Sequence, residues 1–227
     1  MEVIKLPLVF VHLPKTAGTF VRSVLESNYK DVQGVYPPPN FKMLRDMSQD
    51  EKERILKSDV IIGHESVHGF STNLHSDLKF YTILRNPVDR VISYYNHMMT
   101  HDPQYKNRKL SPLSYLENSN DPQLDNLQLR YLSGNAMKQS VGEPELEKAI
   151  SMIESGRIIP GIQEDMQKTF RSLSIFRGAN ASDYAENNKS SFGFSRASMT
   201  NAEIDAFRQH NALDMKLYSY CLDFFNR

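Results

Sequence analysis

Three short apolar runs, each followed by a polar turn, place the strongest constraint on the fold of this chain. They are Leu8–Val11, Val60–Ile62 and Phe80–Leu84, and their length and composition favour buried strands over helices. Apolar residues at helical spacing follow the first run over Thr19–Glu26, and Pro87 follows the third run where the first turn of a helix would begin. Strands that alternate with helices in this way predict βαβ units and a parallel sheet.

Most of the second half of the chain is expected to be helical. The predicted helices cover four segments: 121–134, 143–156, 164–176 and the residues from Thr200 onwards. Residues 157–162 predict a short strand, a capping box at Ser48 predicts another helix, and residues 31–47 and 178–198 have the composition of loops. We therefore expect an α/β fold, with a parallel sheet flanked by helices and a helix-rich C-terminal half, as a single domain over residues 1–227.

Positive and negative side chains balance in this chain. There are 27 Lys and Arg residues and 27 Asp and Glu residues, so the formal net charge is zero. A protein that binds nucleic acid through general electrostatic attraction usually carries an excess of positive charge. Nucleic acid is therefore not an expected partner, although a small local anion site is compatible with this balance.

The chain contains one cysteine, Cys221, and cannot form an internal disulfide. This favours a reducing compartment. The first residues lack the basic and long apolar segments of a signal peptide, and the apolar stretch over Leu6–Leu13 is too short to span a membrane. We therefore expect a cytoplasmic protein with no integral membrane segment.

The turn after the first predicted strand has the features of an anion site. A loop between a buried strand and a helix presents backbone N–H groups at the positive end of the helix. Lys15 adds a positive charge, and Thr16 and Thr19 add hydroxyl groups. The turn does not follow the Walker A pattern, because its glycine, Gly18, comes after the lysine. The spacing alone supports a phosphate site and an ordinary helix cap equally.

A second candidate segment begins at Arg85, where another strand ends and another helix starts. The carboxyl ends of parallel strands share one edge of a sheet, so Arg85 is expected close to the first turn. Its guanidinium suits an anionic oxygen, and Ser93 lies about two helical turns further along. The alternative is a surface arginine that forms an ion pair with Asp89.

Residues 64–68 read as H-E-x-x-H, which is the pattern of zinc proteases when it lies on a helix. Here the pattern follows a predicted strand and is followed at once by Gly69, which is a poor context for a helix, and a third ligand is missing. His64 is instead a candidate general base at a strand end, because a neutral imidazole accepts protons near pH 7. A purely structural histidine is the other reading.

Together, these segments resemble the sulfotransferases that use 3′-phosphoadenosine 5′-phosphosulfate (PAPS), and within them the carbohydrate-type family that contains heparan-sulfate 2-O-sulfotransferase. Residues His12–Phe20 are similar to the 5′-phosphosulfate loop of that family. The segment that starts at Leu84 and continues through Arg90, Ser93 and Tyr94 is similar to its 3′-phosphate segment. Supporting matches lie at Gly63-His64, at 125–134, at 161–164 and at Asp214 with 217–218.

This resemblance implies a P-loop-like fold that binds PAPS as co-substrate at the sheet edge and requires no metal. It implies that Lys15 contacts the 5′-phosphate and the bridging oxygen, and that Arg85 and Ser93 hold the 3′-phosphate. The residues it implies around the phosphosulfate are Thr16, Ala17, Gly18, Thr19 and Phe20. His64 matches the position of the general base, which takes the proton of an acceptor hydroxyl.

The acceptor side of the site stays open at this stage. The residues after His64 differ from those expected in the family, so the base is one of His64, Glu65 and His68. The resemblance implies a glycan or glycoconjugate as acceptor, and the zero net charge favours a neutral or weakly acidic one over a heavily sulfated polyanion. The loop around Asn188 is the one segment suggested for the adenine contacts, and the sequence does not indicate the oligomeric state.

Two other functions compete with this reading. A P-loop nucleotide kinase or phosphotransferase would need a Walker A loop and acidic magnesium ligands at a strand end, whereas the strands here end in His64 and Arg85. A non-catalytic nucleotide-binding protein of the same fold would bind its nucleotide without turnover.

Overall fold

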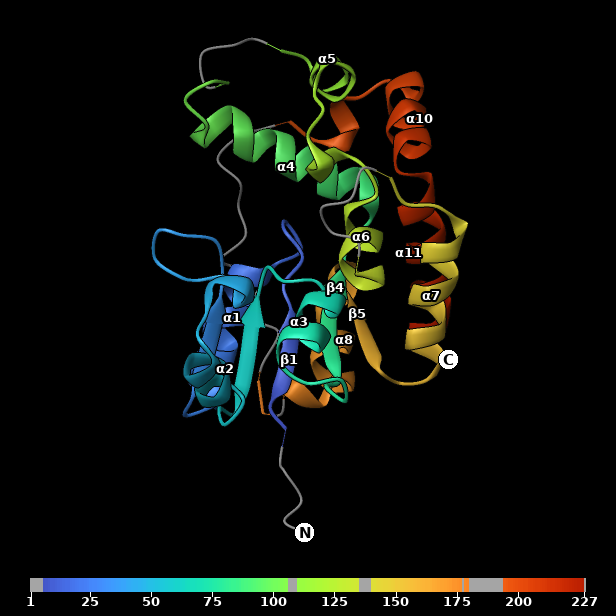
Figure 1. Cartoon of the computed structure of the whole chain (residues 1–227). Coiled ribbons are helices and arrows are strands. Elements are labelled where there is room, and N and C mark those ends of the chain that lie inside the picture. Colours follow the sequence, from blue (N-terminus) through green and yellow to red (C-terminus); the bar gives the residue numbers. More distant parts are fainter. Residues whose placement is uncertain (1–5, 106–109, 135–139, 177, 180–193, 227) are drawn as a thin grey trace.

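The computed structural model describes residues 6–105, 110–134, 140–176, 178–179 and 194–226. Its centre is a parallel sheet in the order β2-β3-β1-β4-β5, which confirms the predicted α/β fold (Figure 1). The strands are β1 Leu8–Val11, β2 Val32–Val35, β3 Val60–Gly63, β4 Phe80–Leu84 and β5 Ile158–Ile162. Because β1 pairs with both β3 and β4, the carboxyl ends of these three strands lie side by side.

Helices cover both faces of the sheet. The described helices are α1 Gly18–Asn28, α2 Gln49–Ile55, α3 Val67–Asn73, α4 Pro87–His101, α5 Pro112–Asn118, α6 Leu127–Ser133, α7 Glu143–Glu154, α8 Met166–Ser172, α10 Asn201–His210 and α11 Ala212–Phe225. Phe10 of β1 packs with side chains of α1 and α8 on one face, whereas Val9 and Val11 pack with α3, α6, α7 and α11 on the other. This alternation is what a strand buried on both faces requires.

A further layer lies beyond the carboxyl end of the sheet. Helices α4, α5 and α10 lie there, at the top of Figure 1, and they share a separate apolar cluster that includes Val91, Tyr95, Leu116 and Phe207. The sheet edge therefore faces the inner side of α4.

The sequence missed one strand and two helices. Residues 31–47 contain the edge strand β2, whose Gln33 and Gly34 weaken the strand pattern and whose stability comes from pairing with β3. Helices α3 and α5 were also not expected. Gly69 argued against a helix after His64, but Ser66 caps α3 by accepting a hydrogen bond from the Gly69 N–H at 3.1 Å. The predicted loop 178–198, including the segment near Asn188, lies mostly outside the described residues.

Three predicted helices are interrupted. The helix over 121–134 becomes a 3-10 turn and α6, because Asn126 adopts a left-handed conformation with φ 46°. The terminal helix breaks at Asn211 into α10 and α11. The helix over 164–176 is reduced to α8 between two 3-10 turns. The short 3-10 helices are Leu44–Asp46, Pro122–Leu124, Gln163–Asp165, Ser174–Phe176 and Arg196–Ser198.

Candidate functional site

A cavity of about 790 Å³ lies at the carboxyl ends of the strands. It is lined by seven of the predicted site residues: Lys15, Ala17, Gly18, Thr19, His64, Arg85 and Ser93. They come from the ends of β1, β3 and β4, from the start of α1 and from the second turn of α4, segments that the sheet topology brings together. The predicted convergence of the two anion-binding segments is therefore present in the structure.

Two predicted residues, Thr16 and Phe20, do not line the cavity. Thr16 is fully buried, and its hydroxyl donates a hydrogen bond to the carbonyl of Leu13 at 2.9 Å. The ring of Phe20 packs edge-on against Phe170, with ring centroids 5.8 Å apart. A role for either residue in ligand binding therefore depends on its backbone.

The turn after β1 adopts an unusual backbone conformation. Lys15 and Ala17 have φ values of 70° and 69°, in the left-handed region that non-glycine residues seldom adopt. Successive residues that alternate in this way turn their N–H groups to one side and form a concave anion site. Ala17 supplies no side-chain cap to α1, and the first turn of that helix contains no acidic residue. The positive end of α1 is therefore open to an anionic ligand.

Lys15 and Arg85 bring uncompensated positive charge to the cavity. The Arg85 guanidinium donates a hydrogen bond to the carbonyl of Lys15 at 3.2 Å. Burial, and then the nearby Arg85, lower the pKa of Lys15. Within the described part of the chain, neither residue forms an ion pair with a carboxylate. The predicted alternative, an Arg85–Asp89 pair, is wrong, because Asp89 pairs with Arg196 at 3.0 Å.

The backbone of Arg85 is held by Gln128 of α6. The Gln128 amide accepts a hydrogen bond from the Arg85 N–H at 2.9 Å and donates one to the Arg85 carbonyl, also at 2.9 Å. Gln128 is fully buried. Two hydrogen bonds from one buried side chain leave Arg85 little freedom to move along or across the sheet edge.

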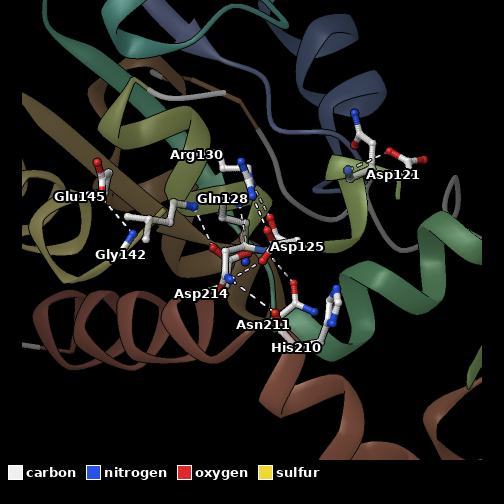
Figure 2. A network of polar contacts seen from close by, with 12 residues as sticks. Asp121, Asp125, Gln128, Arg130, Gly142, Glu145, His210, Asn211 and Asp214 are labelled. Atoms are coloured by element: carbon white, nitrogen blue, oxygen red, sulfur yellow. Dashed lines mark hydrogen bonds and ion pairs between the residues drawn. The ribbon is translucent and has the colours of Figure 1, made fainter. Parts of the chain in front are cut away.

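The start of α6 is held in turn by a buried carboxylate. Asp214 of α11 accepts hydrogen bonds from the N–H groups of Gln128 and Leu129, at 3.1 and 2.8 Å (Figure 2). Asn126 completes the contact by accepting from the Asp214 N–H at 2.9 Å. Burial raises the pKa of Asp214 to about 6. This support for Arg85 runs from α11 through α6 to β4 and was not visible in the sequence.

His64 is oriented by a hydrogen bond to the backbone. Its Nδ1 lies 2.7 Å from the carbonyl oxygen of His12. A carbonyl can only accept, so Nδ1 carries the proton and Nε2 of the neutral ring keeps a lone pair. Burial lowers the pKa of His64 below its ordinary 6.5, although the hydrogen bond opposes this. At neutral pH the ring is therefore uncharged and able to accept a proton at Nε2.

His12 and Tyr36 form the wall behind His64. The His12 and His64 rings lie with centroids 4.2 Å apart, and Nδ1 of His12 is 3.1 Å from the Tyr36 hydroxyl. A Cβ on Gly18 would lie 1.5 Å from Nε2 of His12. Gly18 is therefore needed for the space that His12 occupies as well as for the turn. Burial, and then His64, place the pKa of His12 well below its ordinary value.

The H-E-x-x-H residues do not share a helix. Helix α3 starts at Val67, after His64 and Glu65, so only His68 lies on it. Glu65 lines the cavity, whereas His68 is exposed and does not. In the described residues, no three His, Cys, Asp or Glu side chains gather as metal ligands would.

The sequence missed most of the remaining cavity wall. These additional residues are Pro37, Pro38, Met43, Arg45, Asn73, Tyr94, His97, Gln123, Tyr131 and Gln163. His97 follows Ser93 by four residues, so helical periodicity would have placed it on the same face of α4. Tyr94, Tyr131 and Gln163 lie in segments that the family resemblance covers, but no role was assigned to them. The remaining residues come from segments that carry no recognisable pattern. Arg90, part of the predicted 3′-phosphate segment, is buried and donates to the Gln123 carbonyl.

None of the described helices has both the length and the apolar character needed to cross a membrane.

This chain resembles known proteins in sequence and in fold. Residues 5–221 match the family described as "Sulfotransferase family". A solved sulfotransferase from Alicyclobacillus acidocaldarius aligns with a TM-score of 0.51 and 14% identity, over 99% of this chain and 97% of that chain. Mouse sulfotransferase SULT7A1 complexed with PAP aligns with a TM-score of 0.46 and 14% identity, over 92% of this chain and 66% of that chain. No curated protein matches the sequence.

Proposed function

Because the chain belongs to the sulfotransferase family, we propose that it transfers a sulfuryl group from PAPS to an acceptor hydroxyl, with His64 as the general base. The observation that carries this proposal is the convergence of Lys15, His64, Arg85 and Ser93 on one cavity. Two uncompensated cations and an open helix end suit a nucleotide with phosphate groups at two positions. A neutral imidazole suits an acceptor that must lose a proton.

The turn after β1 would hold the phosphosulfate end of PAPS. Backbone N–H groups over residues 16–20 and the Thr19 hydroxyl are the donors we assign to it, and Lys15 would contact the 5′-phosphate and the bridging oxygen. Positive charge at that oxygen stabilises the negative charge that develops on the leaving group. Arg85 and Ser93 would hold the 3′-phosphate, with Arg85 positioned by Gln128.

His64 would act on the acceptor. Its Nε2 accepts the proton of the hydroxyl as the hydroxyl oxygen forms a bond to sulfur. The bond between sulfur and the bridging oxygen breaks in the same in-line displacement, and the 5′-phosphate leaves with the electron pair. The products are a sulfate ester and 3′-phosphoadenosine 5′-phosphate (PAP). Each role in this proposed step is assigned to a side chain or a backbone group, so the step as proposed uses no metal ion.

We also propose that the acceptor is a glycan or glycoconjugate. We propose further that residues 1–227 form a single domain and that the protein acts in the cytoplasm. Polar residues at the cavity wall, such as Glu65 and Asn73, support a hydroxyl-rich acceptor of the carbohydrate type. The buried, unpaired Cys221 fits a reducing compartment.

Thermal unfolding with added nucleotide tests this proposal. PAP at about 100 times its dissociation constant should stabilise the protein by about 2.7 kcal/mol. We expect Lys15→Ala and Arg85→Ala to reduce this shift, and Lys148→Ala, on the exposed side of α7, to leave it unchanged. A larger shift with ATP and magnesium would favour a kinase. PAP binding without any transfer of labelled sulfate from PAPS would favour a non-catalytic binding protein.

A further inference from the structure

The sheet topology divides the cavity into two ends. Lys15 and Arg85 follow β1 and β4, which are neighbours in the sheet. His64 and Glu65 follow β3, on the other side of β1, and Pro37 follows β2 at the edge of the sheet. If the nucleotide lies at the first end, as proposed above, the acceptor reaches sulfur from the second. Glu65 is then the carboxylate at the acceptor end.

The backbone fixes the position of Glu65. Its Oε1 accepts a hydrogen bond from the Ser66 N–H at 3.0 Å. A Cβ on Gly69 would lie 2.1 Å from the same oxygen, so the carboxylate occupies the space that this glycine leaves. The side chain is therefore placed by two independent contacts on the first turn of α3, next to the proposed base.

The Glu65 carboxylate has no close counter-ion. In the described residues it forms no ion pair. The charges of Arg45 and His68 act on it to lower its pKa, but Arg45, which also lines the cavity, has a side chain that is 76% exposed and pairs with Asp46 at 3.7 Å. Burial raises the pKa of Glu65. A half-buried carboxylate of this kind is stabilised by a hydrogen-bond donor and destabilised by a second negative charge.

We infer that Glu65 determines acceptor specificity, by accepting a hydrogen bond from a donor group beside the attacking hydroxyl and by disfavouring an anionic group there. The donor is a hydroxyl or an amine, so the favoured acceptors are neutral or amino sugars and the disfavoured ones are uronates. This inference rests on the proposed sulfuryl transfer. It assigns Glu65 to acceptor binding and leaves proton removal to His64.

Transfer of labelled sulfate from PAPS to three matched acceptors tests the inference: methyl glucoside, methyl 2-amino-2-deoxyglucoside and methyl glucuronide. Loss of one hydrogen bond to a charged group is expected to lower kcat/KM for an acceptor by about tenfold or more. We expect the wild type to prefer the first two over the glucuronide by at least about tenfold. Glu65→Gln should remove most of this preference, and Glu147→Gln on α7 should not. Saturation-transfer NMR measures binding of the same glycosides to the protein–PAP complex. This readout is independent of turnover.

Several results would overturn the inference. Equal preferences in the wild type and Glu65→Gln, in transfer and in NMR, would overturn it while leaving sulfuryl transfer intact. So would a wild type that prefers the glucuronide, or that binds PAP but none of the three glycosides. A Glu65→Gln variant that binds PAP normally but loses turnover on every acceptor would make Glu65 the base. A wild type that does not bind PAP would overturn the proposed function and this inference with it.

Discussion

Replacement of Gln128 by leucine tests whether Arg85 depends on a buried side chain from another helix. The change keeps the size and the helix propensity of the residue, but it removes both hydrogen bonds to the Arg85 backbone, each 2.9 Å long. The Arg85 N–H and carbonyl then lose their partners at the sheet edge. The Arg85 backbone is then free to shift, which would move its guanidinium away from the carbonyl of Lys15, to which it donates a hydrogen bond.

The expected loss of stability follows from the number of unpaired groups. A buried polar backbone group left without a partner costs about 1–3 kcal/mol. Two such groups give about 2–6 kcal/mol, and the lower half of that range applies because Arg85 is partly exposed and water can reach it. We also expect PAP to bind at least about tenfold more weakly, equivalent to about 1.4 kcal/mol, because the displaced guanidinium no longer faces the cavity.

Urea denaturation measures the free energy of unfolding, and titration calorimetry with PAP measures the affinity. Gln167→Leu on α8 is the matched control, because it makes the same chemical change at an exposed position. Unchanged stability in Gln128→Leu would refute the assignment of the two hydrogen bonds. Reduced stability with unchanged PAP affinity would show that Gln128 supports the fold without positioning Arg85.

Three other predictions follow from the same geometry. Gly18→Ala should displace His12, because the new Cβ would lie 1.5 Å from its Nε2. Urea denaturation should show a loss of about 1–3 kcal/mol in the free energy of unfolding from overpacking. The histidine signals in NMR should also change, and unaltered signals would contradict this prediction. In a pH–rate profile, the acid limb of kcat/KM should be centred below pH 6.5, because burial lowers the pKa of His64 and the base is active when deprotonated. An acid limb centred above pH 6.5 would contradict the assignment of His64 as the base. Ser48→Ala should lower the free energy of unfolding by about 1 kcal/mol through loss of the capping box, without any change in PAP affinity in calorimetry.

Local pattern was enough to predict the elements that carry the binding motifs. The strands β1, β3 and β4 are short apolar runs, because a strand buried on both faces of a sheet needs apolar side chains at nearly every position. Pro87 marks the start of α4 because its fixed φ and missing N–H suit the first turn of a helix. Since parallel strands place their carboxyl ends at one edge, the meeting of Lys15, His64 and Arg85 could also be expected.

Tertiary structure decided the contacts that make these residues a site. The sequence contains no sign that Gln128 holds Arg85, that His12 lies against His64, or that Gly69 makes room for Glu65. Each contact joins a side chain to backbone or ring atoms that are placed by packing of other elements. Such contacts depend on distances of a few ångströms between separate segments, whereas periodicity reports only which face of its own segment a residue occupies. The sequence alone therefore determined which chemistry is available at the sheet edge, and the packing of α3, α4 and α6 around that edge decided how it is oriented.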